Sequence, residues 1–215
     1  MRVNKWQRTV TDLFMIVFLI VFPHTGLLPM YAFSLLLLLL IWLYLRAYKE
    51  NFSNIGFRFN AFTYKSLAVG GVIGIVYAVF TYWIISPVLT HLGFREANLS
   101  DFNYLRHNFF NYLFLLAIAC FLVIPFEEIL FRGFIFSRIK AMAGKQAFKV
   151  SGLITSVLFA LYHYQEGLGA VISIFLFAII TIWLLKLFKG NLWYVIFFHI
   201  TYDIFMLTAI YLGYM

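Results

Sequence analysis

Long apolar runs alternate with short polar segments along most of the chain. A helix needs about 20 apolar residues to cross the hydrocarbon core of a bilayer. Runs of about this length predict an all-α, polytopic transmembrane helical bundle of about seven spans. The expected spans are residues 11–28, 30–46, 66–90, 109–137, 149–166, 168–186 and 191–213. The fourth is too long for one straight crossing, so we expect part of it to lie at the membrane surface.

Basic residues are distributed unevenly among the polar segments. Of the 16 lysines and arginines, only Arg95 and Arg106 fall at one side of the expected spans. The others precede the first span or lie at or after the ends of the second, fourth and sixth. Positively charged connections stay in the cytoplasm. The bias therefore predicts a cytoplasmic N-terminus and an external C-terminus, and it supports an odd number of spans.

Composition gives the same class of protein. Hydrophobic residues make up 64% of the chain and charged residues only 11%, too few to cover a soluble domain. The net charge of +8 is explained by topology-setting residues. We therefore expect membrane lipid as a partner and no nucleic acid. The basic, apolar N-terminus resembles a signal peptide, but no small-residue cleavage site follows, so we interpret it as a retained first helix. Cys120 is the single cysteine, which excludes a disulfide within the chain.

Ionisable side chains inside spans cost about 2.5–3.5 kcal/mol each on insertion scales, so each needs a reason. They fall into three short patterns, "EEILFR", "FALYH" and "HITYD". The residues concerned are Glu127, Glu128, Arg132, His163, His199 and Asp203. Their expected depths would allow the three patterns to meet in one pocket in the cytoplasmic half of the membrane.

Helical spacing assigns partners within these patterns. Glu128 and Arg132 are four residues apart and can pair, which could also be a purely structural ion pair. Glu127 points about 100° away from Glu128 and stays free. Pro125 removes a backbone hydrogen bond and is expected to kink the helix. In the third pattern, His199 and Asp203 share a face, so the carboxylate can orient the imidazole.

Two kinds of catalytic site are compatible with these residues. A carboxylate beside a histidine can activate a water molecule, and a second imidazole can stabilise the oxyanion that forms when water attacks an amide. Alternatively, Glu127, His163 and His199 match a zinc set with one position open for water. The cofactor is thus either Zn²⁺ or none, and both alternatives predict hydrolysis of a peptide bond inside the bilayer.

The three patterns together resemble the motifs EExxxR, FxxxH and HxxxN or HxxxD of the CAAX-protease and bacteriocin-processing (CPBP, or Abi) family of intramembrane proteases. The resemblance covers roughly residues 110 to 210, and the chain divides into residues 1–108, which carry no recognised motif, and a protease core at residues 109–215. The resemblance implies that Glu127 activates water beside His163. It also implies that His199 and Asp203 bind the oxyanion. Aspartate stands where some members have asparagine, and it donates a hydrogen bond only when protonated.

The resemblance also implies a setting and a substrate class. Glu128 and Arg132 would order the site, and the small size is similar to the bacterial branch, in the plasma membrane. Substrates there would be secreted peptides, bacteriocin or pheromone precursors, or membrane proteins rather than prenylated proteins. Two alternatives remain: a non-catalytic bacteriocin immunity or binding protein on the same fold, and a small proton-coupled transporter using Glu127, His163 and Asp203. The oligomeric state is left open.

Overall fold

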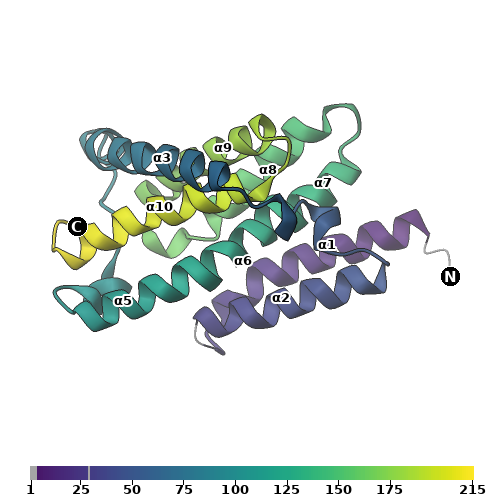
Figure 1. Ribbon diagram of the computed structural model, residues 1–215, viewed down its shortest axis with the longest axis horizontal. Helices are drawn as coiled ribbons and strands as arrows, with labels where there is room; N and C mark the ends of the chain where they lie inside the picture. The colour runs from purple at the N-terminus through teal and green to yellow at the C-terminus, as the bar shows by residue number, and fades with distance from the viewer. Residues whose placement is uncertain (1–3, 29) are drawn as a thin grey trace.

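The computed structural model describes residues 4–28 and 30–215, which fold into helices joined by turns and loops, with no strand among them (Figure 1). The helices are α1 (Lys5–Val21), α2 (Met30–Ala47), α3 (Tyr64–Phe80), α4 (Ser86–His91), α5 (Phe109–Ile118), α6 (Ile124–Glu128), α7 (Phe136–Met142), α8 (Ala147–Leu161), α9 (Leu168–Leu187) and α10 (Leu192–Tyr211). Most of them run along the long axis, and the start of α1 and the C-terminus lie at opposite ends of it (Figure 1).

One pair and one triplet of these helices are parts of longer continuous helices. Helices α3 and α4 belong to the stretch Tyr64–His91, and α5, α6 and α7 belong to Phe109–Met142. The parts are joined by π-helical turns rather than by loops. These turns are Thr81–Ile85, Ala119–Val123 and Ile129–Ile135.

Two of the π-helical turns come directly before a proline. The turn Thr81–Ile85 ends two residues before Pro87, and Ala119–Val123 ends two residues before Pro125. A proline offers no N–H to the carbonyl four residues earlier, and its ring clashes with that carbonyl. A widened turn removes the clash and lets the freed carbonyl find another partner. The local disturbance expected at Pro125 is therefore a wide turn within a continuous helix.

The prediction of a polytopic helical bundle is confirmed. Five helical stretches are long and apolar enough to cross a membrane: Lys5–Thr25, Tyr64–His91, Phe109–Met142, Leu168–Leu187 and Leu192–Tyr211. The other two expected spans correspond to shorter apolar helices, α2 and α8. Helix α8 has 15 residues and ends at Leu161, five residues before the end of the expected span. We had expected His163 to lie inside a helix. It lies instead in the turn that follows α8.

Helix α3 packs closely along α10, and small residues make this possible. A methyl group added to Gly70 would come within 2.5 Å of the carbonyl oxygen of Tyr194. A methyl group on Gly74 would collide with Thr201 and with the Phe198 carbonyl. Small residues let helix backbones approach within a membrane. This contact fixes α10, which carries His199 and Asp203.

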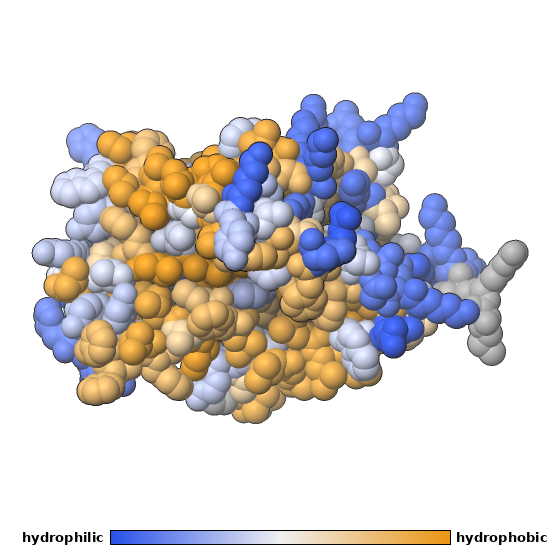
Figure 2. All heavy atoms as spheres, viewed as in Figure 1, coloured by the Kyte–Doolittle hydropathy of each residue, from blue (hydrophilic) through white to orange (hydrophobic). Residues whose placement is uncertain are grey.

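The end of the molecule that holds the N-terminus is strongly hydrophilic, whereas apolar side chains cover the middle (Figure 2). Contacts tie three of the basic segments together at this end. Glu50 accepts hydrogen bonds from both Arg8 and Arg138. Asp12 is 4% exposed, accepts a hydrogen bond of 2.7 Å from Tyr44, and lies 3.7 Å from Arg138 Nε. Arg138, which we had counted among the basic residues at or after the end of the fourth span, is thus a buried partner of two carboxylates.

Candidate active site

The first pattern lies where α6 gives way to the π-helical turn Ile129–Ile135. Glu128 is the last residue of α6, and Arg132 lies within the turn. Its Nε is 3.3 Å from Oε2 of Glu128, and the side chains are 1% and 0% exposed. The predicted pair between Glu128 and Arg132 is therefore present and fully buried. Such π-helical turns within α-helices are frequent at functional sites, and this one carries Arg132.

Three groups hold the Arg132 guanidinium in place. Besides its ion pair with Glu128, its Nε donates a hydrogen bond of 2.9 Å to Oγ1 of Thr181. Thr181 in turn donates to the carbonyl of Ala178 at 2.7 Å. The guanidinium carbon lies 3.9 Å from the centroid of the Phe159 ring, a cation–π contact. The arginine is therefore fixed by residues from α6, α8 and α9.

His199 lies at the centre of three carboxylates. Its Nδ1–H donates a hydrogen bond of 2.8 Å to Oε1 of Glu128. Its Nε2 lies 3.6 Å from Oδ1 of Asp203 and 3.9 Å from Oε2 of Glu127. We had expected Asp203 to orient this imidazole, but the closest carboxylate is that of Glu128. The orienting group thus comes from a helix 71 residues away in the sequence.

The side chain of Glu127 makes no hydrogen bond to another residue in the part of the chain that the structure describes. Its side chain is 12% exposed, compared with 0% for Glu128. One carboxylate of the adjacent pair is thus engaged by Arg132 and His199. The other has free oxygen lone pairs and partial access to solvent. This division is the one predicted from the 100° turn between neighbouring residues.

His163 reaches the site from the turn that follows α8. Its Nδ1–H donates a hydrogen bond of 2.9 Å to the carbonyl of Phe159, so in the neutral ring Nε2 carries the lone pair. The Phe159 ring lies between the two histidines, with its centroid 5.0 Å from that of His163 and 6.0 Å from that of His199. The second pattern therefore packs against the other two through its phenylalanine.

Residues 109–205 match the Rce1-like type II CAAX prenyl endopeptidases. The match contains all three patterns, from Glu127 to Asp203. The resemblance predicted from these patterns is confirmed, and the chain is an integral membrane protein related to a protease family. No match was found among curated proteins or among solved structures. The proposed division between residues 1–108 and 109–215 stays a prediction.

Three residues of this candidate site had no role in the sequence-based interpretation. Phe159 contacts Arg132 and both histidines, Thr181 accepts the hydrogen bond from Arg132, and the Phe177 ring centroid lies 4.8 Å from that of His199. Thr181 gave one detectable signal, because it is a hydroxyl within the apolar run "FAIITIWLL". The two phenylalanines gave none in a chain with 27 of them.

The zinc alternative requires Glu127, His163 and His199 to converge. Among residues 4–28 and 30–215, no group of three His, Cys, Asp or Glu side chains could hold a metal ion. The hydrogen bond from Nδ1 of His199 to Glu128 is compatible with a zinc-bound imidazole, and its Nε2 lies 3.9 Å from Oε2 of Glu127. No described contact joins His163 to either of these side chains, so as arranged the three are not grouped as ligands. The set stays a prediction that applies only if the reaction depends on a metal.

The turn that carries His163 is covered by other segments of the chain. Nε2 of His24, at the end of the first helical stretch, lies 2.8 Å from the carbonyl of Tyr162. On another side, the backbone N–H of Asn98 donates a hydrogen bond of 2.8 Å to the backbone carbonyl of Glu166. Gly169 lets this second segment come close, since a methyl group there would lie 2.6 Å from the Arg95 carbonyl. The turn is thus held in place from both sides.

Proposed function

We propose that this protein is an intramembrane endopeptidase that hydrolyses a peptide bond in a membrane-associated or secreted peptide or protein precursor. The observation that carries the proposal is the convergence of Glu127, Glu128 and Asp203 on the His199 ring, within 3.9 Å. Such a cluster is costly inside an apolar bundle, and groups of this kind mark functional sites in membranes.

Glu127 is the group that we assign to water activation. It is the carboxylate without a hydrogen-bond partner among the described residues, and it retains partial solvent access. As water attacks the carbonyl carbon, Glu127 takes a proton from it and later delivers a proton to the leaving amine. We place Nε2 of His163 beside the same water, because Nδ1 is occupied by the Phe159 carbonyl.

His199 is the group that we assign to the oxyanion. Glu128 fixes the ring through Nδ1, so that Nε2 faces Glu127 and Asp203. In its protonated form the ring presents Nε2–H, which is a donor to the developing negative charge. Asp203 would stabilise that form. Arg132 neutralises Glu128 and holds it in place, so it acts as a positioning residue.

The matching family is named for prenyl endopeptidases, but the three patterns resemble those of the wider family that also processes bacteriocins. We therefore propose the broader class of precursor peptides and membrane proteins as substrates. We also propose a cytoplasmic location for the basic end of the molecule, as the distribution of lysine and arginine predicts. A bacterial plasma membrane is the setting that fits the resemblance.

The test compares cells that carry the wild-type protein, Glu127→Gln or Glu96→Gln at matched expression. Glu96 is exposed in a loop, so its variant controls for the same chemical change. Mass spectrometry of membrane and secreted peptides should show a precursor that accumulates uncleaved only with Glu127→Gln. Identical profiles in all three strains would contradict the proposal and favour an immunity or binding role.

A second measurement addresses the metal. The purified protease should retain its activity on that precursor after dialysis against a strong chelator, because the described carboxylates and imidazoles are not grouped as ligands. Activity lost on chelation and regained with Zn²⁺ would overturn the metal-free mechanism. It would instead favour the set of Glu127, His163 and His199.

A further inference from the structure

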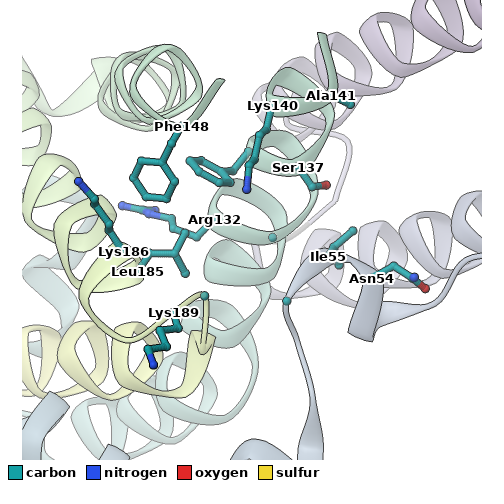
Figure 3. Close-up of a pocket in the computed structure, with 14 residues that line it drawn as sticks. Asn54, Ile55, Arg132, Ser137, Lys140, Ala141, Phe148, Leu185, Lys186 and Lys189 are labelled. Carbon is teal, nitrogen blue, oxygen red and sulfur yellow. The ribbon is translucent and has the colours of Figure 1, made fainter. Parts of the chain in front are cut away.

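A cavity of about 700 Å³ opens between the end of α7, the end of α9 and the segment Asn54–Gly56 (Figure 3). Four cationic side chains line it, Arg132, Lys140, Lys186 and Lys189, and none of its lining residues is acidic. We call it the basic pocket. In Figure 3 the three lysines surround Arg132. Its volume lies within the range of about 300–1,000 Å³ that is typical of small-molecule sites.

A second cavity, also lined by the end of α7, contains both basic and acidic side chains and can be compared with the basic pocket. That cavity has a volume of about 530 Å³, and its lining includes Lys5, Arg8 and Arg138 together with the carboxylates Asp12 and Glu50. The two arginines are paired with those carboxylates, which leaves Lys5 as its one cation without an ion pair among the described residues. In the basic pocket, by contrast, the three lysines form no ion pair with any described residue.

Arg132 makes the pocket more than a group of loop lysines. The residue is 2% exposed, and both of its terminal nitrogens are buried without a hydrogen-bond partner among residues 4–28 and 30–215. Nε is the nitrogen that pairs with Glu128 and donates to Thr181, and the face of the guanidinium lies against the Phe159 ring. Buried donors of a charged group are costly to leave unpaired. The positive-inside bias accounts for lysines at this end, but it does not account for an unsatisfied guanidinium in the cavity that they line.

We propose that the basic pocket binds a phosphate-bearing anion. A phosphate carries up to two negative charges and several acceptor oxygens, which suit three ammonium groups and one guanidinium. The source could be the headgroup of an anionic phospholipid or a soluble phosphate. The location favours the lipid, because basic pockets between membrane helices at the cytoplasmic side bind anionic headgroups.

Occupancy of the basic pocket bears on the candidate active site through one residue. Arg132 lines the pocket and also pairs with Glu128, which orients His199. An anion at its terminal nitrogens would hold the guanidinium in the position that the site uses. Binding itself does not depend on protease activity, so the two proposals can fail separately.

The experiment measures binding to the full chain in neutral detergent at constant ionic strength. Short-chain phosphatidylglycerol, inorganic phosphate and short-chain phosphatidylcholine are titrated separately, and dissociation constants follow from the rise of the unfolding midpoint. The variant K140Q/K186Q/K189Q should bind phosphatidylglycerol on the order of 100-fold more weakly than wild type. The control K65Q/K145Q/K149Q removes the same charge from exposed lysines outside the pocket and should stay within about threefold.

The three titrations distinguish a lipid headgroup from a soluble phosphate as the bound anion. Lysine-dependent binding of phosphatidylglycerol that exceeds binding of inorganic phosphate supports a lipid headgroup, and the reverse order supports a soluble phosphate. No preference of either over phosphatidylcholine would overturn the proposal, as would equal losses in the two triple variants. If the pocket variant does not fold, Lys186→Gln and Lys189→Gln alone should each weaken binding about fivefold, and unchanged affinity in both would overturn it.

Discussion

His199 donates a hydrogen bond of 2.8 Å from its Nδ1–H to Oε1 of Glu128, and this bond joins α10 to the end of α6. The second oxygen of the same carboxylate lies 3.3 Å from Nε of Arg132. One buried carboxylate therefore sets the positions of an imidazole and a guanidinium at once. Its neighbour Glu127 is free of both tasks, and the adjacent glutamates of "EEILFR" take different roles.

The first prediction concerns this shared carboxylate. Glu128→Gln should lower the free energy of unfolding by about 3–5 kcal/mol, because it leaves the Arg132 charge buried without its partner. Asp203→Asn should lower it by less than about 1 kcal/mol, since Asp203 is 31% exposed and does not pair with an arginine. Both variants should lower proteolysis. Unfolding of each in mixed micelles, followed by circular dichroism, checks the difference, and equal stabilities would contradict it.

Thr181 is the subject of the second prediction. Thr181→Val keeps the shape of the side chain but removes the acceptor for Arg132 Nε. A hydrogen bond to a charged group contributes about 1.5–3 kcal/mol, so stability should fall by this amount and proteolysis should fall with it.

The matched control for Thr181 is Thr90→Val. Its hydroxyl is exposed and bonds only to the Ser86 carbonyl, at 3.1 Å. Surface changes of this kind usually stay within about 0.5 kcal/mol. A similar loss in both variants would show that Thr181 has no special role in holding Arg132.

Glu50 provides a prediction about pH. Burial acts to raise its pKa, but the hydrogen bonds and charges of Arg138 and Arg8 outweigh burial and hold the pKa below its usual value. A lowered pKa in the folded state means that the pair stabilises the fold above about pH 4.3, the ordinary glutamate value. That contribution is lost as the pH falls further, through the lowered pKa.

Unfolding midpoints at pH 7 and at successively lower pH values test this. Glu50→Gln should lower the midpoint at pH 7, and it should also reduce the loss of stability that wild type shows on acidification. Glu96→Gln, in an exposed loop, should reproduce the wild-type profile. A Glu50→Gln profile parallel to that of wild type at every pH would exclude this carboxylate as the source.

The contact between α3 and α10 gives the fourth prediction. Gly70→Ala should cost about 1–3 kcal/mol, because its methyl group would lie 2.5 Å from the Tyr194 carbonyl, a backbone atom that cannot rotate away. Gly71→Ala is the control in the same run, since its methyl group would make an ordinary contact of 3.4 Å with Thr201. The ratio of folded to unfolded protein in mixed micelles should fall for the first variant only.

Much of this architecture could be predicted because the membrane imposes simple rules on the sequence. Apolar run length located the five stretches that are long enough to cross a membrane and the two shorter helices α2 and α8. The four-residue spacing identified the pair between Glu128 and Arg132. These features depend on length or on neighbours within one helix, and both can be read along the chain.

What could not be predicted depends on contacts between distant segments. Three carboxylates lie near His199, and spacing alone favoured Asp203 because it is on the same helix. The partner that the fold selects, Glu128, lies on another. The position of His163 was missed for a different reason, since the aromatic residues Tyr162 and Tyr164 were counted with the apolar run although α8 ends at Leu161. Gly167, at φ +96°, was the local signal that a turn had been reached.

The short α8 also has a consequence for the lipid around the protein. Its 15 residues span only about 22 Å, whereas the hydrocarbon core is about 30 Å thick. Exposed side chains such as Leu153, Val157 and Leu161 give it an apolar outer face. A bilayer matches such a short helix by thinning beside it or by drawing the flanking polar residues to its surface, a case of hydrophobic mismatch. Under the proposed function, we expect a substrate helix beside α8 to meet this mismatch close to the turn that carries His163.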